Sequence, residues 1–255
     1  YMHNGFTYNI KTKKRIAAII FVHTFGNLCK IDKLLTECKK RNIITIEDAA
    51  ESLGAYYNKG RFKNKYAGTL ADIGCYSFNG NKIITTGAGG ALVTNNKKFY
   101  TLACYLSSQA KDDPLHYIHN TIGYNLKMPN LSAALGCSQI EKILIKIKKK
   151  KNIFLLYKKY LDSLSFINFI EPPNYSNSNY WLILIVIDFY KEKKNKFNFV
   201  NYLYRKKIEV RPLWRSNHLQ KPYKNCQNFN IENSTFFLKN TICLPSSSHL
   251  SAEKI

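Results

Sequence analysis

The feature that most constrains the fold of this chain is an unbroken apolar run, IAAIIFV, at residues 16–22. An apolar run of strand length is typical of a β-strand that is covered on both faces. Residues 27–41 then show apolar side chains at helical spacing and end in three basic residues, as expected near a helix C-terminus. A second apolar strand follows at residues 43–46. This order of strand, helix and strand predicts two parallel strands and an α/β fold.

The residues that end these strands are candidate site residues, because ligands bind open α/β sheets at the carboxyl ends of parallel strands. Asp48 ends the second strand, and His23 follows the first. Asp48 either serves a cofactor or caps the segment that follows it, and the sequence leaves both roles open. His23 is a candidate for contact with a substrate, although a histidine at a strand end is more often a hydrogen-bonded structural residue.

A third predicted strand, residues 72–78, leads into the loop SFNGNKIITTGAGG at residues 77–90. This loop contains the hydroxyl of Ser77, one amine in Lys82 and several glycines. Hydroxyls and glycine-flanked backbone amides bind phosphate oxygens, and a lysine amine attacks an aldehyde. Pyridoxal phosphate carries both groups and therefore suits the loop. Because lysine is abundant in the chain, Lys82 is a weak indication when it is taken alone.

The formal charge of +23 would ordinarily suggest a nucleic acid or an anionic membrane as partner. The lysines are spread along the chain, however, and the densest run, residues 146–151, lies in a pattern that predicts a solvated helix face. We expect no nucleic-acid partner, because no aromatic-interleaved basic motif is present. We also expect no membrane span, because the apolar runs are too short.

The seven cysteines are scattered and never spaced as CxxC. This pattern indicates neither a zinc site nor a disulfide framework, so we expect no metal and a reducing, cytoplasmic location. Strand and helix patterns continue through residues 180–188, 193–206 and 208–214. They predict a second, smaller domain over residues 152–255, joined by a long helix to a large domain over residues 1–151.

Three separated motifs carry a resemblance to a known family: IEDAAESLGA at residues 46–55, SFNGNKIITTGAGG at 77–90 and GYNLKMPNLSAALGCSQIE at 123–141. In order and spacing they closely resemble the DegT/DnrJ/EryC1/StrS family of sugar aminotransferases. With EVRPLW at 209–214, the chain looks most like the branch that aminates 4-keto nucleotide sugars for legionaminic acid, bacillosamine and perosamine type surface glycans. The resemblance implies fold type I, with a mixed, mainly parallel sheet in the large domain and a smaller C-terminal α/β domain.

The resemblance also implies roles for individual residues. Lys82 would form the internal Schiff base with pyridoxal 5′-phosphate and transfer protons, while Asp48 would face the pyridine nitrogen. Ser77 matches a serine that binds the cofactor phosphate. Glu51 takes the place of a glutamine near the phenolic oxygen, where a carboxyl group donates only when it is protonated. Asn125 matches an asparagine that reaches the cofactor of a neighbouring subunit, which implies a homodimer.

Arg211, Trp214 and His218 offer positive charge and a flat ring suited to a nucleotide diphosphate and its base. The alternative is a core tryptophan with surface cations, and the sequence leaves both open. The implied reaction transfers an amino group from an amino acid, taken to be L-glutamate, to a 4-keto-6-deoxy nucleotide sugar.

Two other functions stay open. One is a related cofactor-dependent sugar dehydratase, in which a histidine replaces the lysine at position 82. The other is an inactive remnant or binding module, because family members carry a glycine-serine/threonine phosphate loop upstream of the strand at Ile16, and this sequence has none. We therefore expect the natural chain to begin before Tyr1.

Overall fold

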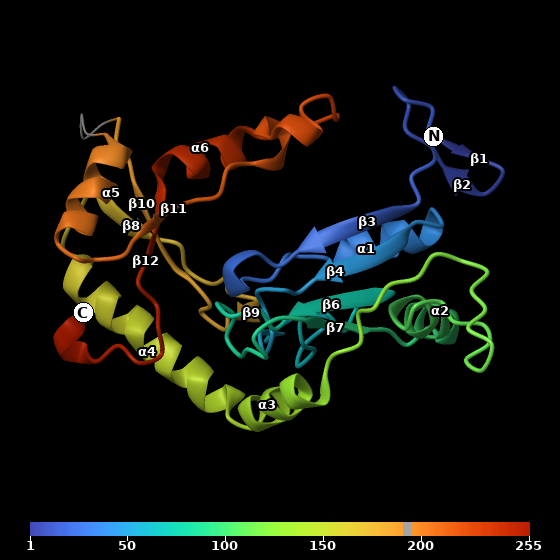
Figure 1. The fold of residues 1–255 in the computed structure, drawn as a ribbon. Coiled ribbons are helices and arrows are strands. Elements are labelled where there is room, and N and C mark those ends of the chain that lie inside the picture. Colours follow the sequence, from blue (N-terminus) through green and yellow to red (C-terminus); the bar gives the residue numbers. More distant parts are fainter. Residues whose placement is uncertain (191–194) are drawn as a thin grey trace. The chain divides into compact units, whose positions relative to one another are not determined.

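The computed structural model describes residues 1–190 and 195–255 (Figure 1). The chain divides into two compact units. The first unit consists of Tyr1–Lys148 and Pro172–Trp181, and the second of Lys149–Glu171 and Leu182–Ile255. The short segment Pro172–Trp181 therefore belongs to the first unit, although it lies within residues 152–255, which were predicted to form the C-terminal domain. The division into two domains at residue 151 stays a prediction.

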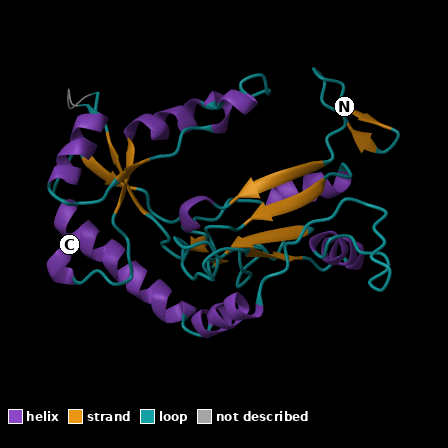
Figure 2. Ribbon diagram, in the orientation of Figure 1, coloured by secondary structure: helices purple, strands orange, loops and turns teal. Residues whose placement is uncertain are grey.

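The first unit is built on a four-stranded sheet in the order β3-β4-β6-β7, whose strands are labelled in Figure 1 and drawn in orange in Figure 2. Strands β3 (Ala18–Val22), β4 (Ile44–Asp48) and β6 (Ile73–Ser77) are parallel, and β7 (Gly90–Val93) pairs antiparallel with β6. Helix α1 (Asp32–Lys40) connects β3 to β4 and completes the predicted strand, helix, strand unit. The sheet is therefore mixed and mainly parallel, which confirms the expected α/β fold.

One face of this sheet is covered more fully than the other. On β3, Phe21 is buried together with Leu28, Ile31 and Cys38, which lie on the connection to β4 and in α1. The neighbouring side chains point to the opposite face, since side chains alternate along a strand. Of these, Ile20 is 60% exposed and Val22 is 45% exposed. The prediction that this strand is covered on both faces is wrong for the described residues.

Three helices follow the sheet, and the last of them begins in the first unit and continues into the second. Helix α2 (Lys97–Ser107) is capped by Asn96, whose side chain accepts hydrogen bonds from two backbone N–H groups of the first turn. Where one long helix was predicted, the chain forms α3 (Asn130–Ile140) and α4 (Ile143–Leu161), separated by a turn. The remaining elements of this unit are β1 (Met2–His3), β2 (Phe6–Thr7), η1 (Thr24–Gly26), β5 (Tyr56–Tyr57) and β9 (Ser176–Asn177).

The second unit contains an antiparallel sheet in the order β11-β12-β10-β8. Its core strand β10 (Ile183–Ile187) is almost entirely buried. The predicted helix at 193–206 is α5 (Lys196–Arg205), and residues 193 and 194 lie outside the described part of the chain. The other elements are β8 (Ile167–Phe169), β11 (Arg211–Pro212), η2 (Asn217–Leu219), η3 (Lys221–Tyr223), α6 (Glu232–Asn240), β12 (Thr241–Leu244) and η4 (Ala252–Lys254).

The basic run of α4 is not a uniformly solvated face, which corrects the prediction for residues 146–151. Lys150 is only 7% exposed, and its Nζ donates to the carbonyl oxygen of Ser246. Burial lowers the pKa of Lys150 to about 8. Lys146 Nζ donates to Oε1 of Gln139 at 2.7 Å. These two lysines make specific contacts, and the other lysines of the run are exposed.

Candidate active site

Asp48 and Ser77 lie at the carboxyl edge of the parallel strands. The strand register pairs Val22 with Asp48 and Asp48 with Cys75. Ser77 is two residues beyond Cys75 on β6, so it shares a face of the sheet with Asp48. The parallel pairing therefore brings these two candidates to one edge and one face.

The Asp48 side chain also shapes the backbone that follows β4. Its Oδ1 accepts the backbone N–H of Ala50 at 3.0 Å, which is the capping role considered from the sequence. An ionised carboxylate has about four acceptor positions on its two oxygens, so this one bond is compatible with a second donor. Asp48 is half-buried, which is a suitable setting for holding a charged ligand atom.

Lys82 extends from the loop after β6 toward Glu51. The buried side chains of Ile83 and Ile84 anchor this loop, and the Lys82 backbone N–H donates to the Asn79 carbonyl at 3.0 Å. Lys82 Nζ lies 4.0 Å from Oε1 of Glu51, and the two side chains are 13% and 15% exposed. This distance exceeds hydrogen-bond length, so the pair is a loose electrostatic contact.

Glu51 is oriented by a turn that follows β3. Phe25 has a left-handed backbone with φ of 61° and donates its N–H to Glu51 Oε2 at 2.6 Å. Burial raises the pKa of Glu51; the Phe25 N–H and the charge of Lys82 oppose this rise, and the charge of Asp48 adds to it. A raised pKa favours the protonated carboxyl group, which is the form of glutamate that donates a hydrogen bond.

Ser77 stands at the base of the Lys82 loop. Its Oγ accepts the Asn79 N–H at 3.4 Å, and the Phe78 N–H bonds the Gly89 carbonyl at 2.9 Å across the loop. Gly87 and Gly89 adopt φ values of 84° and 93°, which few residues other than glycine tolerate. The backbone of the loop is therefore preshaped by its own hydrogen bonds and glycines.

Two side chains that hold this loop were not identified from the sequence. Trp181 Nε1 donates to the Asn81 carbonyl at 2.7 Å, and the centre of its ring lies 4.1 Å from Lys82 Nζ. Gln139 Nε2 donates to the Thr85 carbonyl at 2.7 Å, and its Oε1 accepts the Thr85 N–H at 3.3 Å. These contacts span 100 and 54 residues of sequence, so no local pattern marks them.

His23 has a closed environment. It is 0% exposed, its Nε2 lies 2.8 Å from Glu47 Oε2, and its Nδ1 accepts the Cys29 N–H at 3.1 Å. Three backbone N–H groups within residues 68–71 also donate to the Glu47 carboxylate. Burial alone would raise the pKa of Glu47, but these hydrogen bonds lower it below its ordinary value. The arrangement fits the structural alternative for His23.

The other predicted site residues are Asn125 in the first unit and three residues of the second unit. Asn125 is exposed in the first unit and forms an isolated antiparallel bridge with Ser108. Arg211, Trp214 and His218 belong to the second unit, in and after β11. Arg211 forms an exposed ion pair with Glu209 at 2.6 Å, and Trp214 is 52% exposed. A role for these three in binding a nucleotide stays a prediction.

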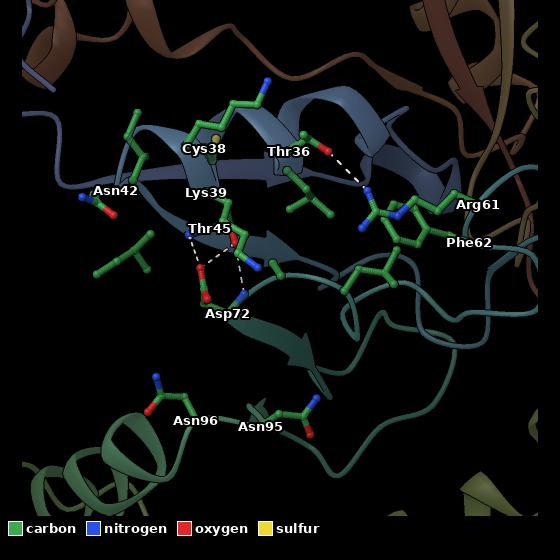
Figure 3. Close-up of a pocket in the computed structure, with 16 residues that line it drawn as sticks. Thr36, Cys38, Lys39, Asn42, Thr45, Arg61, Phe62, Asp72, Asn95 and Asn96 are labelled. Atoms are coloured by element: carbon green, nitrogen blue, oxygen red, sulfur yellow. Dashed lines mark hydrogen bonds between the residues drawn. The ribbon is translucent and has the colours of Figure 1, made fainter. Parts of the chain in front are cut away.

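A cavity of about 1000 Å³ opens at the amino ends of β4 and β6, which is the opposite end from Asp48 (Figure 3). Within it, Asp72 accepts hydrogen bonds from both the backbone N–H and the hydroxyl of Thr45. None of the predicted site residues lines this cavity. We place the candidate site at the carboxyl edge of the sheet, because ligands bind open α/β sheets at that edge. The volume of the cavity at the amino ends does not change this choice.

Residues 1–190 and 195–255 contain no group of three or more His, Cys, Asp or Glu side chains placed to bind a metal. In the same part of the chain, no helix combines the length and apolar character needed to cross a membrane. All seven cysteines are free thiols.

The DegT/DnrJ/EryC1/StrS aminotransferase family matches residues 9–255 of the chain. The putative pyridoxal phosphate-dependent aminotransferase EpsN of Bacillus subtilis (strain 168) is 35% identical over 241 residues, covering 93% of this chain and 60% of EpsN. GDP-perosamine synthase of Escherichia coli O157:H7 is 35% identical over 213 residues, covering 84% of this chain and 56% of that enzyme. The chain thus spans about 60% of the length of these relatives.

Solved structures agree on the fold. The Helicobacter pylori aminotransferase PseC, involved in the biosynthesis of pseudoaminic acid, superposes with a TM-score of 0.83 at 23% identity, over 93% of this chain and 63% of PseC. DesI, solved in the presence of its TDP-sugar product, superposes with a TM-score of 0.84 at 20% identity, over 95% of this chain and 60% of DesI. These likenesses show the fold alone. The match over residues 9–255 shows that the chain belongs to the DegT/DnrJ/EryC1/StrS aminotransferase family.

Proposed function

We propose that this chain acts as a pyridoxal phosphate-dependent aminotransferase that moves an amino group from L-glutamate to the 4-keto group of a 4-keto-6-deoxy nucleotide sugar, for bacterial surface glycans. The names of the relatives support this substrate class. Besides GDP-perosamine synthase, they include a UDP-4-amino-4,6-dideoxy-N-acetyl-beta-L-altrosamine transaminase of Campylobacter jejuni, 32% identical over 192 residues.

The observation that carries the proposal is the placement of the Lys82 amine 4.0 Å from Glu51, in the loop that leaves the edge where Asp48 and Ser77 share a face. These donors and acceptors fit pyridoxal phosphate. The group has a ring nitrogen that suits a carboxylate, a phosphate that suits a hydroxyl, and an aldehyde that suits an amine. When bound, it supplies the electron-accepting ring that amino-group transfer requires.

Each residue of the group then has a task. With the cofactor bound, Asp48 would face the ring nitrogen and keep it protonated, and Ser77 would hold the phosphate. Lys82 Nζ would supply the amine for the aldehyde and, once free, would accept and return a proton as general base and acid. Glu51, whose pKa burial raises, would donate a hydrogen bond when it is protonated. Lys82 is the residue on which the whole assignment depends.

The proposal extends to assembly and location. Asn125 is exposed, as a residue must be to reach a neighbouring subunit, so we propose a homodimer in which it contacts the partner's cofactor. The seven free thiols are compatible with a reducing cytoplasm. Arg211, Trp214 and His218 are proposed to contact the nucleotide.

The test supplies the full chain with pyridoxal phosphate, L-glutamate and a panel of GDP-, UDP- and dTDP-linked 4-keto-6-deoxy sugars. We expect mass spectrometry to detect a 4-amino sugar from at least one member of the panel. Lys82→Arg, which keeps the positive charge but cannot take the place of the reactive amine, should yield none. An equal yield from the Lys82→Arg variant would contradict the assignment of the amine.

The same reaction separates the two rival functions. A dehydratase would give a product that lacks a ring hydroxyl and carries no new amine. A remnant or binding module would leave every sugar of the panel unchanged. Either result would overturn the aminotransferase proposal.

A further inference from the structure

We propose that Trp181 and Gln139 are positioning residues that hold the Lys82 loop on both sides of the lysine. The inference rests on the proposed role of Lys82 as the reactive amine. Each side chain comes from outside the loop, and each bonds the loop backbone within three residues of Lys82. Neither belongs to the group formed by Asp48, Glu51 and Ser77.

Trp181 acts on the side that precedes Lys82. Its indole N–H donates to the carbonyl of Asn81 at 2.7 Å, and the same ring lies beneath the lysine, 4.1 Å from Nζ. Trp181 is 3% exposed, so the ring is fixed by its surroundings. Its own backbone N–H donates to Oδ1 of Asn179, a residue that is 0% exposed and bonds the carbonyl of Glu51. The tryptophan is thus tied to the segment that presents Glu51 as well as to the lysine loop.

Gln139 acts on the side that follows Lys82. Its amide bonds both the carbonyl and the N–H of Thr85, much as a neighbouring strand would. Lys146 fixes which way the amide points, because an ammonium group only donates and its Nζ lies 2.7 Å from Oε1 of Gln139. The Gln139 NH2 group is therefore directed at the Thr85 carbonyl.

The distance between Lys82 and Glu51 explains why the loop needs two further contacts, from Trp181 and Gln139, which we call the clamp residues. Lys82 reaches Glu51 only across 4.0 Å, too far for a hydrogen bond to fix the amine. A reactive group displaced by about 1 Å loses much of its rate, so its backbone must be held by other contacts. Trp181 and Gln139 supply these backbone contacts, and neither forms a hydrogen bond with the amine, which contacts only the face of the Trp181 ring among these two side chains.

The test uses conservative variants of the full chain. Trp181→Phe keeps a ring but loses the N–H donor, and Gln139→Glu keeps an acceptor for the Thr85 N–H but loses the donor to its carbonyl. Ser138→Ala, an exposed position on the same helix as Gln139, is the matched control. Hydrogen exchange of the amides in residues 78–86 is measured without cofactor, with the amides of β4 as an internal reference.

We expect each clamp variant to speed exchange in the loop by about fivefold to tenfold, the loss expected for one hydrogen bond. Exchange in β4 and in Ser138→Ala should not change. In a second measurement, pyridoxal phosphate is added, and the absorbance of the bound cofactor and the rate of borohydride-stable labelling of Lys82 are followed. Both clamp variants should label Lys82 more slowly by a similar factor and shift the absorbance.

Loop exchange within twofold of the wild-type rate in both clamp variants would overturn the inference. So would labelling of Lys82 at the wild-type rate despite faster exchange, because the clamps would then be purely structural. If wild-type Lys82 takes up no label at all, the proposed function fails, and the exchange measurement by itself decides whether the two side chains hold the loop.

Discussion

Two pairs of a basic side chain and a carboxylate near the same edge of the sheet differ in how completely they are bonded. The pair of His23 and Glu47 is fully buried, joined at 2.8 Å and surrounded by backbone donors. The pair of Lys82 and Glu51 is separated by 4.0 Å, and both side chains retain some exposure. A pair of ionisable side chains near the end of a strand is therefore not by itself a sign of a reactive site.

Because the two pairs are bonded differently, we expect their carboxylates to have different roles. Glu47 is stabilised in its ionised form by hydrogen bonds that lower its pKa, so it fixes the backbone around it. The Glu51 carboxylate accepts the Phe25 N–H, and burial raises its pKa, so its protonated form is favoured more than that of an exposed glutamate. We therefore expect a structural role for the pair of His23 and Glu47, and the proposed chemical role stays with the pair of Lys82 and Glu51.

The largest difference between the two pairs is expected when each carboxylate is removed in turn. Glu47→Ala leaves His23 and three backbone N–H groups without a buried partner, which should lower the free energy of unfolding by about 3 to 5 kcal/mol. Glu51→Ala removes one hydrogen bond and a loose ion pair and should cost about 1 kcal/mol. Urea denaturation measures both values, and similar losses would refute the distinction.

A smaller loss of stability is expected from a substitution in the turn that presents the Phe25 N–H to Glu51. At Gly26, φ is +88°, and an added Cβ would lie 2.0 Å from Oδ1 of Asn179. Because Asn179 is buried and held by several hydrogen bonds, Gly26→Ala should destabilise the chain by about 2 to 4 kcal/mol.

The matched control for this variant is Gly87→Ala. Gly87 has a φ of +84° with open space around it, so alanine there meets only the backbone strain, about 1 kcal/mol. Thermal unfolding of the two variants separates the steric clash from the strain. Equal losses would show that Asn179 moves aside and does not fix the turn near Glu51.

The smallest effects are pH-dependent and opposite in sign. Glu47 has a lowered pKa, so its ionised form stabilises the fold above its ordinary value of 4.5, and this stability is lost as the pH falls through the lowered pKa. Glu51 has a raised pKa, so ionisation costs stability above 4.5 and costs nothing below it.

Glutamine substitutions therefore test the two signs directly. At neutral pH, Glu47→Gln should destabilise the chain and Glu51→Gln should stabilise it slightly. The Glu51→Gln difference should shrink as the pH falls through the raised pKa of Glu51 toward 4.5. The Glu47→Gln difference should persist to about pH 4.5 and shrink only below it, as the pH falls through the lowered pKa of Glu47. Denaturation at a series of pH values measures them, and two differences of the same sign would contradict the assignment.

The sequence was sufficient to predict the sheet and part of the site. The apolar run at 16–22 and the strand at 43–46 predict parallel pairing, and parallel pairing in turn places Asp48 and Ser77 at one edge. These inferences succeed because they depend on local periodicity and on the direction of the strands. The family motifs add Lys82 and Glu51, whose roles stay predictions.

Other features lay beyond sequence reasoning for a physical reason. Trp181 and Gln139 reach the Lys82 loop from 100 and 54 residues away, and their contacts depend on tertiary packing. The closed environment of His23 depends on Glu47, which lies 24 residues away on the adjacent strand. Exposure of Ile20 also follows from which elements pack on the sheet, and an apolar run alone does not specify that.

The central claim is that Lys82, and no other lysine, is the reactive amine. The direct test incubates the chain with pyridoxal phosphate, reduces it with borohydride and locates the pyridoxyl group by peptide mass mapping. The label should lie on the peptide that contains Lys82 and should disappear in Lys82→Arg. A label spread over surface lysines, or one that persists at full yield on another lysine in that variant, would contradict the account.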